Sequence, residues 1–247
     1  MKKSIALLCV VVCAISGLEL PPEMKKCKRN EPDMNACLKS AMQAAFPVLL
    51  KGLPDFKLDS IEPIKVPSLS IGEGTGAVHV VQNYKNVEIH NIHSIVIESV
   101  ESSVSDDQFV IQSEGFIKEC GFKADYEING NILVMPVTGS GKCTIDLENT
   151  KVSMKMVGEK FSKKDHDYFE IKQFEVSLDP KMVKFDFQNL FNGDARLGDE
   201  MNKLLNDNWN EIFTDVKGGY EEALGAIFMG IANVIFKKVP FDEMFPL

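Results

Sequence analysis

The sequence lacks an apolar run long enough to cross a membrane. Its most apolar stretch after the N-terminus, residues 223–236, covers about 14 positions, whereas a membrane-spanning helix needs ~20. Asn233 also interrupts that stretch with a polar side chain. We therefore expect no integral membrane segment in the mature chain.

A surplus of positive charge is also lacking. The 27 Lys and Arg residues are outnumbered by 36 Asp and Glu residues, which gives a formal net charge of -9 at pH 7. Nucleic acids and anionic membrane surfaces attract proteins mainly through clustered Lys and Arg. Nucleic acid is therefore not an expected partner.

Motifs for catalysis and cofactor binding are missing as well. Gly139-Ser140-Gly141-Lys142 resembles a phosphate loop, but Pro136 takes the leading glycine position and a predicted strand follows in place of a helix. A strand also follows Gly72, Gly74 and Gly76, which therefore fail as a dinucleotide-binding fingerprint. The sequence has no nucleophile elbow, no paired carboxylate in an apolar run and no cysteine beside a histidine. We predict that the protein is not an enzyme and needs no cofactor.

Metal-ligand spacing is likewise absent. His90 and His93 are three positions apart, and on a strand an odd spacing sends side chains to opposite faces. The segment Asp165-His166-Asp167 lies between two predicted strands, where a solvated turn is the expected structure. No metal site is predicted.

Residues 1–16 have the pattern of a secretory signal peptide. Lys2 and Lys3 precede an apolar run over residues 5–15, and the small residues Ala14 and Ser16 are placed for cleavage after Ser16. The predicted mature domain is residues 17–247, a secreted, extracellular protein. No Asn-x-Ser/Thr sequon is present, so N-glycosylation is not expected.

Cysteine usage agrees with secretion. Cys27 and Cys37 lie ten positions apart in a charged loop, and an oxidising compartment favours a disulfide between so close a pair. Cys120 and Cys143 flank a predicted hairpin and its neighbouring turn, which leaves them two strands apart. Two buried free thiols are favoured there, and a second bridge stays open.

The longest pattern in the chain is a C-terminal amphipathic helix predicted over residues 195–238. Its start is marked by Asp194 and its end by Pro240, and we expect a kink at Gly218-Gly219, because each glycine costs about 1 kcal/mol in a helix interior. A helix cannot bury such a stripe on itself, so the rest of the chain must wrap it. Large apolar residues recur every three or four positions, at Leu197, Met201, Leu204, Leu205, Trp209, Ile212, Phe213, Val216, Tyr220, Leu224, Ile227, Ile231, Val234 and Ile235.

Two further segments precede the strand region. Residues 33–51 are predicted to form a shorter amphipathic helix with Asp33 as its N-cap. Residues 52–76 contain prolines at positions 54, 63 and 67, which forbid helix and central strand but allow an extended edge or rim.

Residues 77–188 have the pattern of antiparallel strands. Turns are predicted at Asn129-Gly130, at residues 139–141 and at Asp179-Pro180. Apolar parity reverses between Leu147 and Val152, and again between Ile171 and Phe174, which predicts inserted bulge residues and hence bent strands. A strongly curved sheet is the expected result. Its concave face is predicted to hold Ile145, Leu147, Met154, Met156, Phe174, Val176, Phe185 and Phe187.

From the residues alone, two interiors are equally compatible with this pattern. The sheet and helices can enclose a channel lined by adaptable residues such as Met135, Met154 and Met156, or the same side chains can meet as a solid core.

The chain resembles the insect takeout and juvenile-hormone-binding family over essentially its whole mature length. The similarity lies first in Cys27 and Cys37 with the predicted helix that follows to Pro47, and in the predicted strand segment DYEINGNILVMPVTGSGKC. It lies also in residues 190–246, which contain FNGDARLGDEMNKLLNDNWNEIF and end with KKVPFDEMFP. This resemblance implies an α+β, TULIP-like tubular lipid-binding fold, in which a curved antiparallel sheet wraps a long C-terminal helix around a hydrophobic tunnel. Gly218-Gly219 stands where members often have proline, and no cysteine follows Cys143, which places the chain nearer the takeout branch.

The resulting hypothesis is a secreted, monomeric carrier of a small elongated hydrophobic ligand such as a terpenoid, a juvenile-hormone-like molecule, a fatty acid or a semiochemical. Tyr126 and Tyr220 are candidates for orienting that ligand. The predicted tunnel wall is Phe46, Phe109, Ile111, Tyr126, Met135, Ile145, Leu147, Met154, Met156, Phe174, Val176, Phe185, Leu205, Trp209, Phe213 and Tyr220. The alternative is an extracellular interaction protein that docks on a membrane or a receptor through an exposed apolar rim near residues 61–71.

Overall fold

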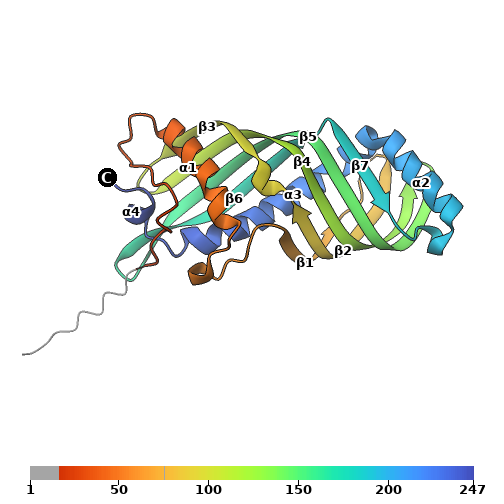
Figure 1. The fold of residues 1–247 in the computed structure, drawn as a ribbon, viewed down its shortest axis with the longest axis horizontal. Coiled ribbons are helices and arrows are strands. Elements are labelled where there is room, and N and C mark those ends of the chain that lie inside the picture. Colours follow the sequence, from red (N-terminus) through yellow and green to blue (C-terminus); the bar gives the residue numbers. More distant parts are fainter. Residues whose placement is uncertain (1–16, 75) are drawn as a thin grey trace, which may run out of the picture.

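The computed structural model describes residues 17–74 and 76–247, so the predicted signal peptide lies outside the described residues. The molecule is elongated, with α1, α4 and the C-terminus at one end and α2 at the other (Figure 1). The elements, in chain order, are α1 (Met34–Leu49), η1 (Pro54–Phe56), β1 (Ile64–Ile71), β2 (Val78–His90), η2 (Ile92–Ser94), β3 (Val96–Val104), β4 (Gln108–Ile132), β5 (Met135–Lys163), β6 (His166–Asp179), β7 (Met182–Phe187), η3 (Phe191–Gly193), α2 (Ala195–Asp207), α3 (Trp209–Phe236) and α4 (Phe241–Met244).

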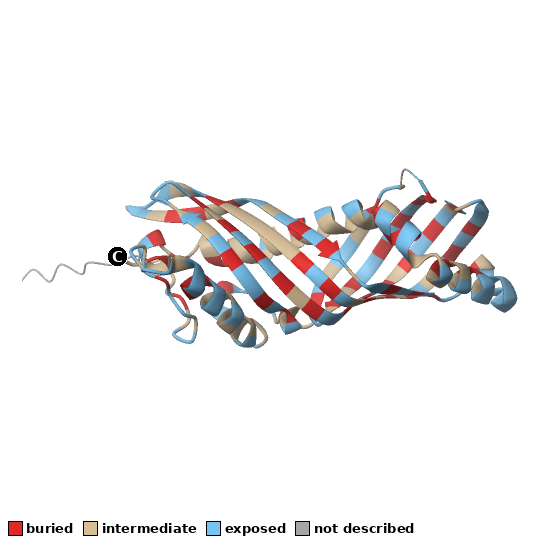
Figure 2. Ribbon diagram, turned by 90° about the horizontal axis from the view of Figure 1, so that it is seen from above, coloured by how far each residue is buried: buried red, intermediate tan, exposed pale blue. Residues whose placement is uncertain are grey.

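One curved antiparallel sheet wraps α3, as expected. Its strands follow the order β1-β2-β4-β5-β6, while β3 pairs with residues 109–116 of β4 and β7 with residues 143–148 of β5. The sheet does not close on itself, and α3 runs lengthwise along its concave side (Figure 1). Buried and exposed residues alternate along the long strands, so each strand presents one face to the interior (Figure 2).

The bends in the strands were predicted correctly, but one of their causes was wrong. The register between β5 and β6 shifts between Val157 and Gly158, so Lys172 is an inserted residue and the predicted bulge in β6 is confirmed. Between β4 and β5 no register shift occurs where the parity of β5 reverses. Instead, β4 reverses parity at the same level, at Lys118 and Glu119, and Asn149 in β5 takes a positive φ of 51°. The two strands therefore bend together, and the pairing between them stays in step.

Two predicted turns were wrong. Asn129 and Gly130 lie inside β4, paired with Val81 and Val80 of β2, and the hairpin instead turns at Leu133-Val134. Residues 139–141 lie inside β5. A Cβ at Gly141 would lie 2.4 Å from the carbonyl oxygen of Gln188, so this glycine allows close packing of two backbones and makes no turn. The turn at Asp179-Pro180 is confirmed between β6 and β7.

The C-terminal helix is interrupted at a different place from the predicted one. Asn208 separates α2 from α3, with non-helical angles of φ -116° and ψ 24°, and its side-chain amide donates to the carbonyl oxygen of Leu204 at 2.8 Å. Gly218 and Gly219 lie within the continuous helix α3. A Cβ at Gly219 would lie 2.8 Å from Cγ2 of Ile71, so this glycine brings α3 close to β1.

The predictions for the helix cap, the cysteines and the edge segment are confirmed. Asp33 is the N-cap of α1, and its side chain accepts a hydrogen bond from the backbone N–H of Ala36. Cys27 and Cys37 form a disulfide, and Cys120 and Cys143 are free and buried. Residues 64–71 form an edge strand. None of the helices in the described ranges is long and apolar enough to span a membrane.

Candidate ligand-binding cavity

The space between the sheet and α3 is hollow, so a solid core is wrong. A cavity of about 370 Å³ lies between β4, β5 and β6 on one side and α3 on the other, and α1 with the N-terminal segment closes one end. Along α3 its wall extends from Phe213 to Phe236, which at ~1.5 Å per residue corresponds to a length of about 35 Å. This volume lies in the usual range for small-molecule sites.

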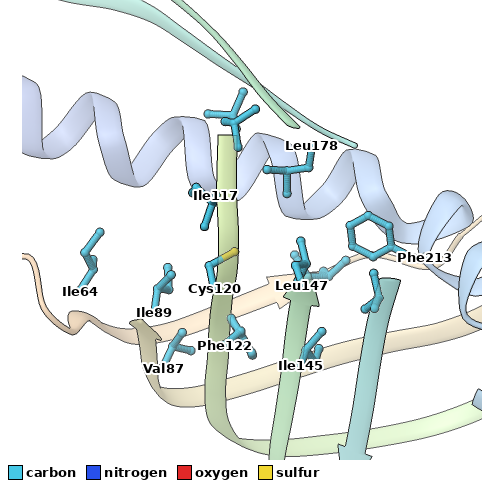
Figure 3. Close-up of a cluster of buried hydrophobic side chains, with 14 of the residues drawn as sticks. Ile64, Val87, Ile89, Ile117, Cys120, Phe122, Ile145, Leu147, Leu178 and Phe213 are labelled. Atoms are coloured by element: carbon cyan, nitrogen blue, oxygen red, sulfur yellow. The ribbon is translucent and has the colours of Figure 1, made fainter. Parts of the chain in front are cut away.

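The wall of this cavity is almost wholly apolar. Among the residues that line it, Lys25 is the one with a charged side chain, and it belongs to the N-terminal segment at the α1 end. The close-up in Figure 3 shows Ile117, Cys120, Ile145 and Leu147 of the sheet facing α3, with Phe213 on the helix side. Such a wall favours an elongated apolar molecule, because away from Lys25 no side chain in it compensates a desolvated charge.

Many of the predicted tunnel residues lie on this wall. Leu147 and Met154 face the same cavity although the parity of β5 reverses between them, as the curved-sheet argument required. The predicted residues that line the cavity are Phe46, Ile111, Ile145, Leu147, Met154, Met156, Phe174, Val176, Phe213 and Tyr220.

Six predicted residues lie elsewhere. Phe185 and Leu205, together with Phe187, line a second cavity of about 30 Å³ near α2. Phe109 is fully buried against Phe169, with ring centroids 4.9 Å apart, and fills space beyond the cavity wall.

The other three are displaced by local structure. The Tyr126 hydroxyl donates to the backbone carbonyl of Gln188 at 2.6 Å and so does not face the cavity. Met135 follows the hairpin turn and is exposed. Trp209 is the first residue of α3 and packs, partly buried, against the core without lining the cavity.

Sequence reasoning missed the residues that close the α1 end. Leu38 and Met42 of α1, Ile61 and Ile64 near β1, and Phe245 after α4 all line the cavity. The helical periodicity of residues 33–51 predicted an amphipathic helix, but it did not show what the apolar face of that helix covers. The return of the C-terminal segment to α1 is a tertiary contact with no local sequence signal.

A small polar cluster stands between the two cavities. Tyr84 and Gln82 come from β2, and Tyr220 comes from α3. The Tyr84 and Tyr220 hydroxyls each lie 2.8 Å from Oε1 of Gln82 and 2.7 Å from each other. Burial raises the pKa of both phenols, so both remain protonated hydrogen-bond donors.

The free cysteines are placed for packing. Cys120 lines the cavity, and Cys143 is buried beside Ala124 of β4. Burial raises the pKa of each thiol to about 12. Because the thiolate is the reactive form, neither cysteine is suited to nucleophilic chemistry at neutral pH.

The two histidines that were assigned to opposite faces in fact converge. His90 ends β2 and His93 lies in η2, and their Nδ1 atoms lie 3.0 and 3.1 Å from the two carboxylate oxygens of Glu62. The backbone N–H of Asn91 donates to the same carboxylate at 2.7 Å. The strand ends between the histidines, so the odd-spacing argument did not apply. No cluster suited to a metal ion was found in the described part of the chain.

Similarity to known proteins agrees with this geometry. The crystal structure of Epiphyas postvittana Takeout 1 matches with a TM-score of 0.77 at 24% sequence identity, covering 90% of this chain and 100% of that chain, and so has the same fold. The circadian clock-controlled protein daywake of Drosophila melanogaster is 25% identical over 248 residues, covering 98% of this chain and 94% of daywake. Its counterpart in Drosophila yakuba is 25% identical over 231 residues, covering 91% and 88%.

The profile of one protein family extends over nearly the whole chain. That family is described as haemolymph juvenile hormone binding protein, and it matches residues 5–246. The curved sheet, the long helix and the apolar cavity are therefore shared with a family of binding proteins for small hydrophobic molecules, and this chain belongs to the haemolymph juvenile hormone binding protein family.

Proposed function

We propose that the protein is a secreted carrier that binds one elongated hydrophobic molecule in the cavity between the sheet and α3. The observation behind this proposal is the cavity itself, about 370 Å³ in volume and lined along α3 by apolar side chains. Affinity would come mainly from burial of apolar ligand surface. The predicted signal peptide and the haemolymph description of the family both support secretion. We expect the mature protein to be residues 17–247 and to act as a monomer.

The chemistry of the cavity wall indicates the class of ligand. A long, narrow apolar cavity with one charged residue at one end fits terpenoids, fatty acyl compounds and similar lipids. The chain has no cysteine after Cys143, so we place it nearer the takeout proteins than the hormone carriers of the family.

The alternative function, docking through an apolar rim, has no support in the segment where it was expected. Ile61, Ile64 and Ile71 are buried, and Leu69 lines the cavity. The exposed positions of β1 include Lys65 and Ser68, which are polar. This segment therefore closes the cavity.

Ligand binding can be tested with recombinant residues 17–247 stripped of co-purified lipid. A polarity-sensitive naphthylamine fluorophore should brighten saturably, and long-chain terpenoid or acyl compounds should displace it at about one molecule per chain. We expect micromolar affinity or better, roughly -8 kcal/mol, because ordering costs consume much of the burial energy. Failure of every compound in a broad lipid panel to displace the probe would contradict the carrier function.

A further inference from the structure

A layer of buried side chains separates the main cavity from the second cavity. The two cavities share no lining residue in the described part of the chain. On β2, Gln82 lines the second cavity and Ile89 lines the main one, and Tyr84 is buried between them. On α3, Val216 lines the second cavity and Tyr220 lines the main one. Because the Tyr84 and Tyr220 hydroxyls touch, the strand and the helix pass from one cavity to the other at the same level.

The same boundary continues across the next two strands of the sheet. On β4 and β5 it is formed by Ala124, Tyr126 and Cys143, which are buried between residues that line one cavity and residues that line the other. Tyr126 is paired with Tyr84 of β2, and Ala124 is paired with Cys143. These four residues therefore form a continuous layer across three neighbouring strands. Together with Tyr220 of α3 they are here named the septum.

Tyr220 is the member of the septum that lines the main cavity, and contacts with β2, β4 and α3 hold its ring in place. Its hydroxyl lies 2.7 Å from the Tyr84 hydroxyl and 2.8 Å from Oε1 of Gln82. Its ring meets that of Phe122 edge to face, with centroids 6.1 Å apart, and stacks on that of Phe213 at 6.5 Å. If the ring swung aside, buried polar groups would lose their hydrogen bonds, which is costly. The Tyr220 ring is therefore a fixed part of the cavity wall.

We propose that Tyr220 sets the depth to which a ligand chain enters the protein, by stopping its inner end at the septum. This inference rests on the proposed carrier function and adds the residue that determines selectivity for chain length. An apolar chain gains free energy with each methylene that it buries, so affinity should rise with length until the chain reaches Tyr220. Further methylenes then stay at the α1 end and add little. Behind Tyr220, the second cavity of about 30 Å³ is lined by apolar side chains apart from Gln82, so it can accept methylenes once the ring is removed.

The test measures affinity against chain length. Unbranched fatty-acid methyl esters that lengthen by two carbons per step displace the naphthylamine probe from lipid-stripped residues 17–247. In wild type, each added methylene should tighten binding about fourfold until the chain reaches the septum, after which the affinity should level off. In Tyr220→Ala the rise should continue past that length, so that the longest esters bind about tenfold more tightly than they bind to wild type.

Further variants separate the position of the ring from general effects on packing. Tyr220→Phe keeps the ring and should level off at the wild-type length. Leu205→Ala enlarges the second cavity without opening the septum, and it should level off at that length as well. Tyr220→Ala/Leu205→Ala should extend the rise beyond that of Tyr220→Ala alone, because the enlarged second cavity is then joined to the main one. If circular dichroism shows that Tyr220→Ala does not fold, Tyr220→Leu provides the same comparison, because leucine is apolar and shorter than tyrosine.

Three results would overturn the role of Tyr220 and leave the carrier function standing. The first is a levelling-off at the same chain length in wild type and in the folded Tyr220→Ala variant. The second is a wild-type affinity that rises over the whole ester series. The third is an extended rise in Leu205→Ala alone, because the ligand would then already pass the septum. Failure of every ester to displace the probe from wild type would instead count against the carrier function itself.

Discussion

Asn233 of α3 pairs with both backbone groups of Ile171 in β6. Its Oδ1 accepts from the Ile171 N–H at 2.8 Å, and its Nδ2 donates to the Ile171 carbonyl at 3.0 Å. Asn202 and Asn206 of α2 make the same paired contacts with Phe187 and Phe185 of β7. Side-chain amides thus replace a neighbouring strand along sheet edges that would otherwise expose unpaired groups.

Asn233→Leu should destabilise the protein although it makes the helix more apolar. The substitution leaves the N–H and carbonyl of the buried Ile171 without partners, and we expect a loss of about 1–3 kcal/mol in the free energy of unfolding. Asn210→Leu on an exposed position of α3 is the control and should change stability little. Urea unfolding followed by circular dichroism would measure the stability of both variants. Equal stabilities of the two variants would show that the amide contact is dispensable.

Two glycines of α3 should respond oppositely to alanine. A Cβ at Gly225 would lie 2.3 Å from the carbonyl oxygen of Phe174, so Gly225→Ala must push the helix off β6 and should cost about 1–3 kcal/mol. A Cβ at Gly218 would meet nothing within 4 Å, so Gly218→Ala should stabilise the helix by about 1 kcal/mol. Thermal unfolding of the two variants would decide, and a stabilising Gly225→Ala would contradict the close approach.

A charge in the cavity should abolish binding without unfolding the protein. Met154 lines the cavity and is partly buried, so Met154→Glu places a carboxylate where an apolar ligand would lie. Met182→Glu, on an exposed position of β7, is the matched control and should bind as wild type does. Probe displacement with circular dichroism measures both effects. Undiminished binding by a folded Met154→Glu variant would place the ligand elsewhere.

Thiol chemistry should distinguish the four cysteines of residues 17–247. Denatured, unreduced protein should show two free thiols, from Cys120 and Cys143, because Cys27 and Cys37 are bridged. In the native protein both thiols should react slowly at pH 8, since burial raises each pKa to about 12. Cys27→Ser/Cys37→Ser should cost roughly 2.5–3 kcal/mol from the closed loop of ten residues. Rapid native alkylation of two thiols would contradict the burial.

Acid should weaken the contact between Glu62 and the end of β2. Burial raises the pKa of Glu62, but hydrogen bonds from Asn91, His90 and His93 together lower it below 4.5. A carboxyl with a lowered pKa contributes stability that is present above its unfolded value and is lost as the pH falls through its folded value. Glu62→Gln should therefore flatten the decline in unfolding free energy below about pH 4.5, whereas Glu127→Gln on the exposed face should leave it unchanged. If the unfolding free energy of wild type and of Glu62→Gln declined identically at low pH, Glu62 would have no such role.

Local signals in the sequence were reliable where neighbouring residues decide the structure. Asp33 as a helix cap, the Cys27–Cys37 bridge and the parity reversal around Lys172 depend on short-range geometry, and all three are confirmed. The curvature of the sheet, and with it the hollow interior, could therefore be expected from the order of apolar residues and from the family resemblance.

Tertiary contacts account for what the sequence did not show. Asn129-Gly130 has strong turn propensity, yet pairing with β2 keeps both residues in a strand, and the chain turns at Leu133-Val134. Trp209 belongs to the apolar stripe, but the break at Asn208 places it at the helix start, away from the cavity. Met135 was expected on the channel wall as an adaptable methionine, but its place next to the turn exposes it.

The uninterrupted pairing of β4 with β5 makes one wall of the cavity hard to spread. This ladder runs in one register from Gln108 opposite Glu159 to Ile132 opposite Met135, so spreading that wall would break consecutive backbone hydrogen bonds. The α1 end is instead closed by short segments and side chains. For example, the Gln43 side chain donates a hydrogen bond to the Ile95 carbonyl and accepts one from the Ile97 N–H, at the edge formed by β3. For a ligand held in this cavity, we therefore expect a bulky ring to be a greater obstacle than a few extra carbons on a slender chain.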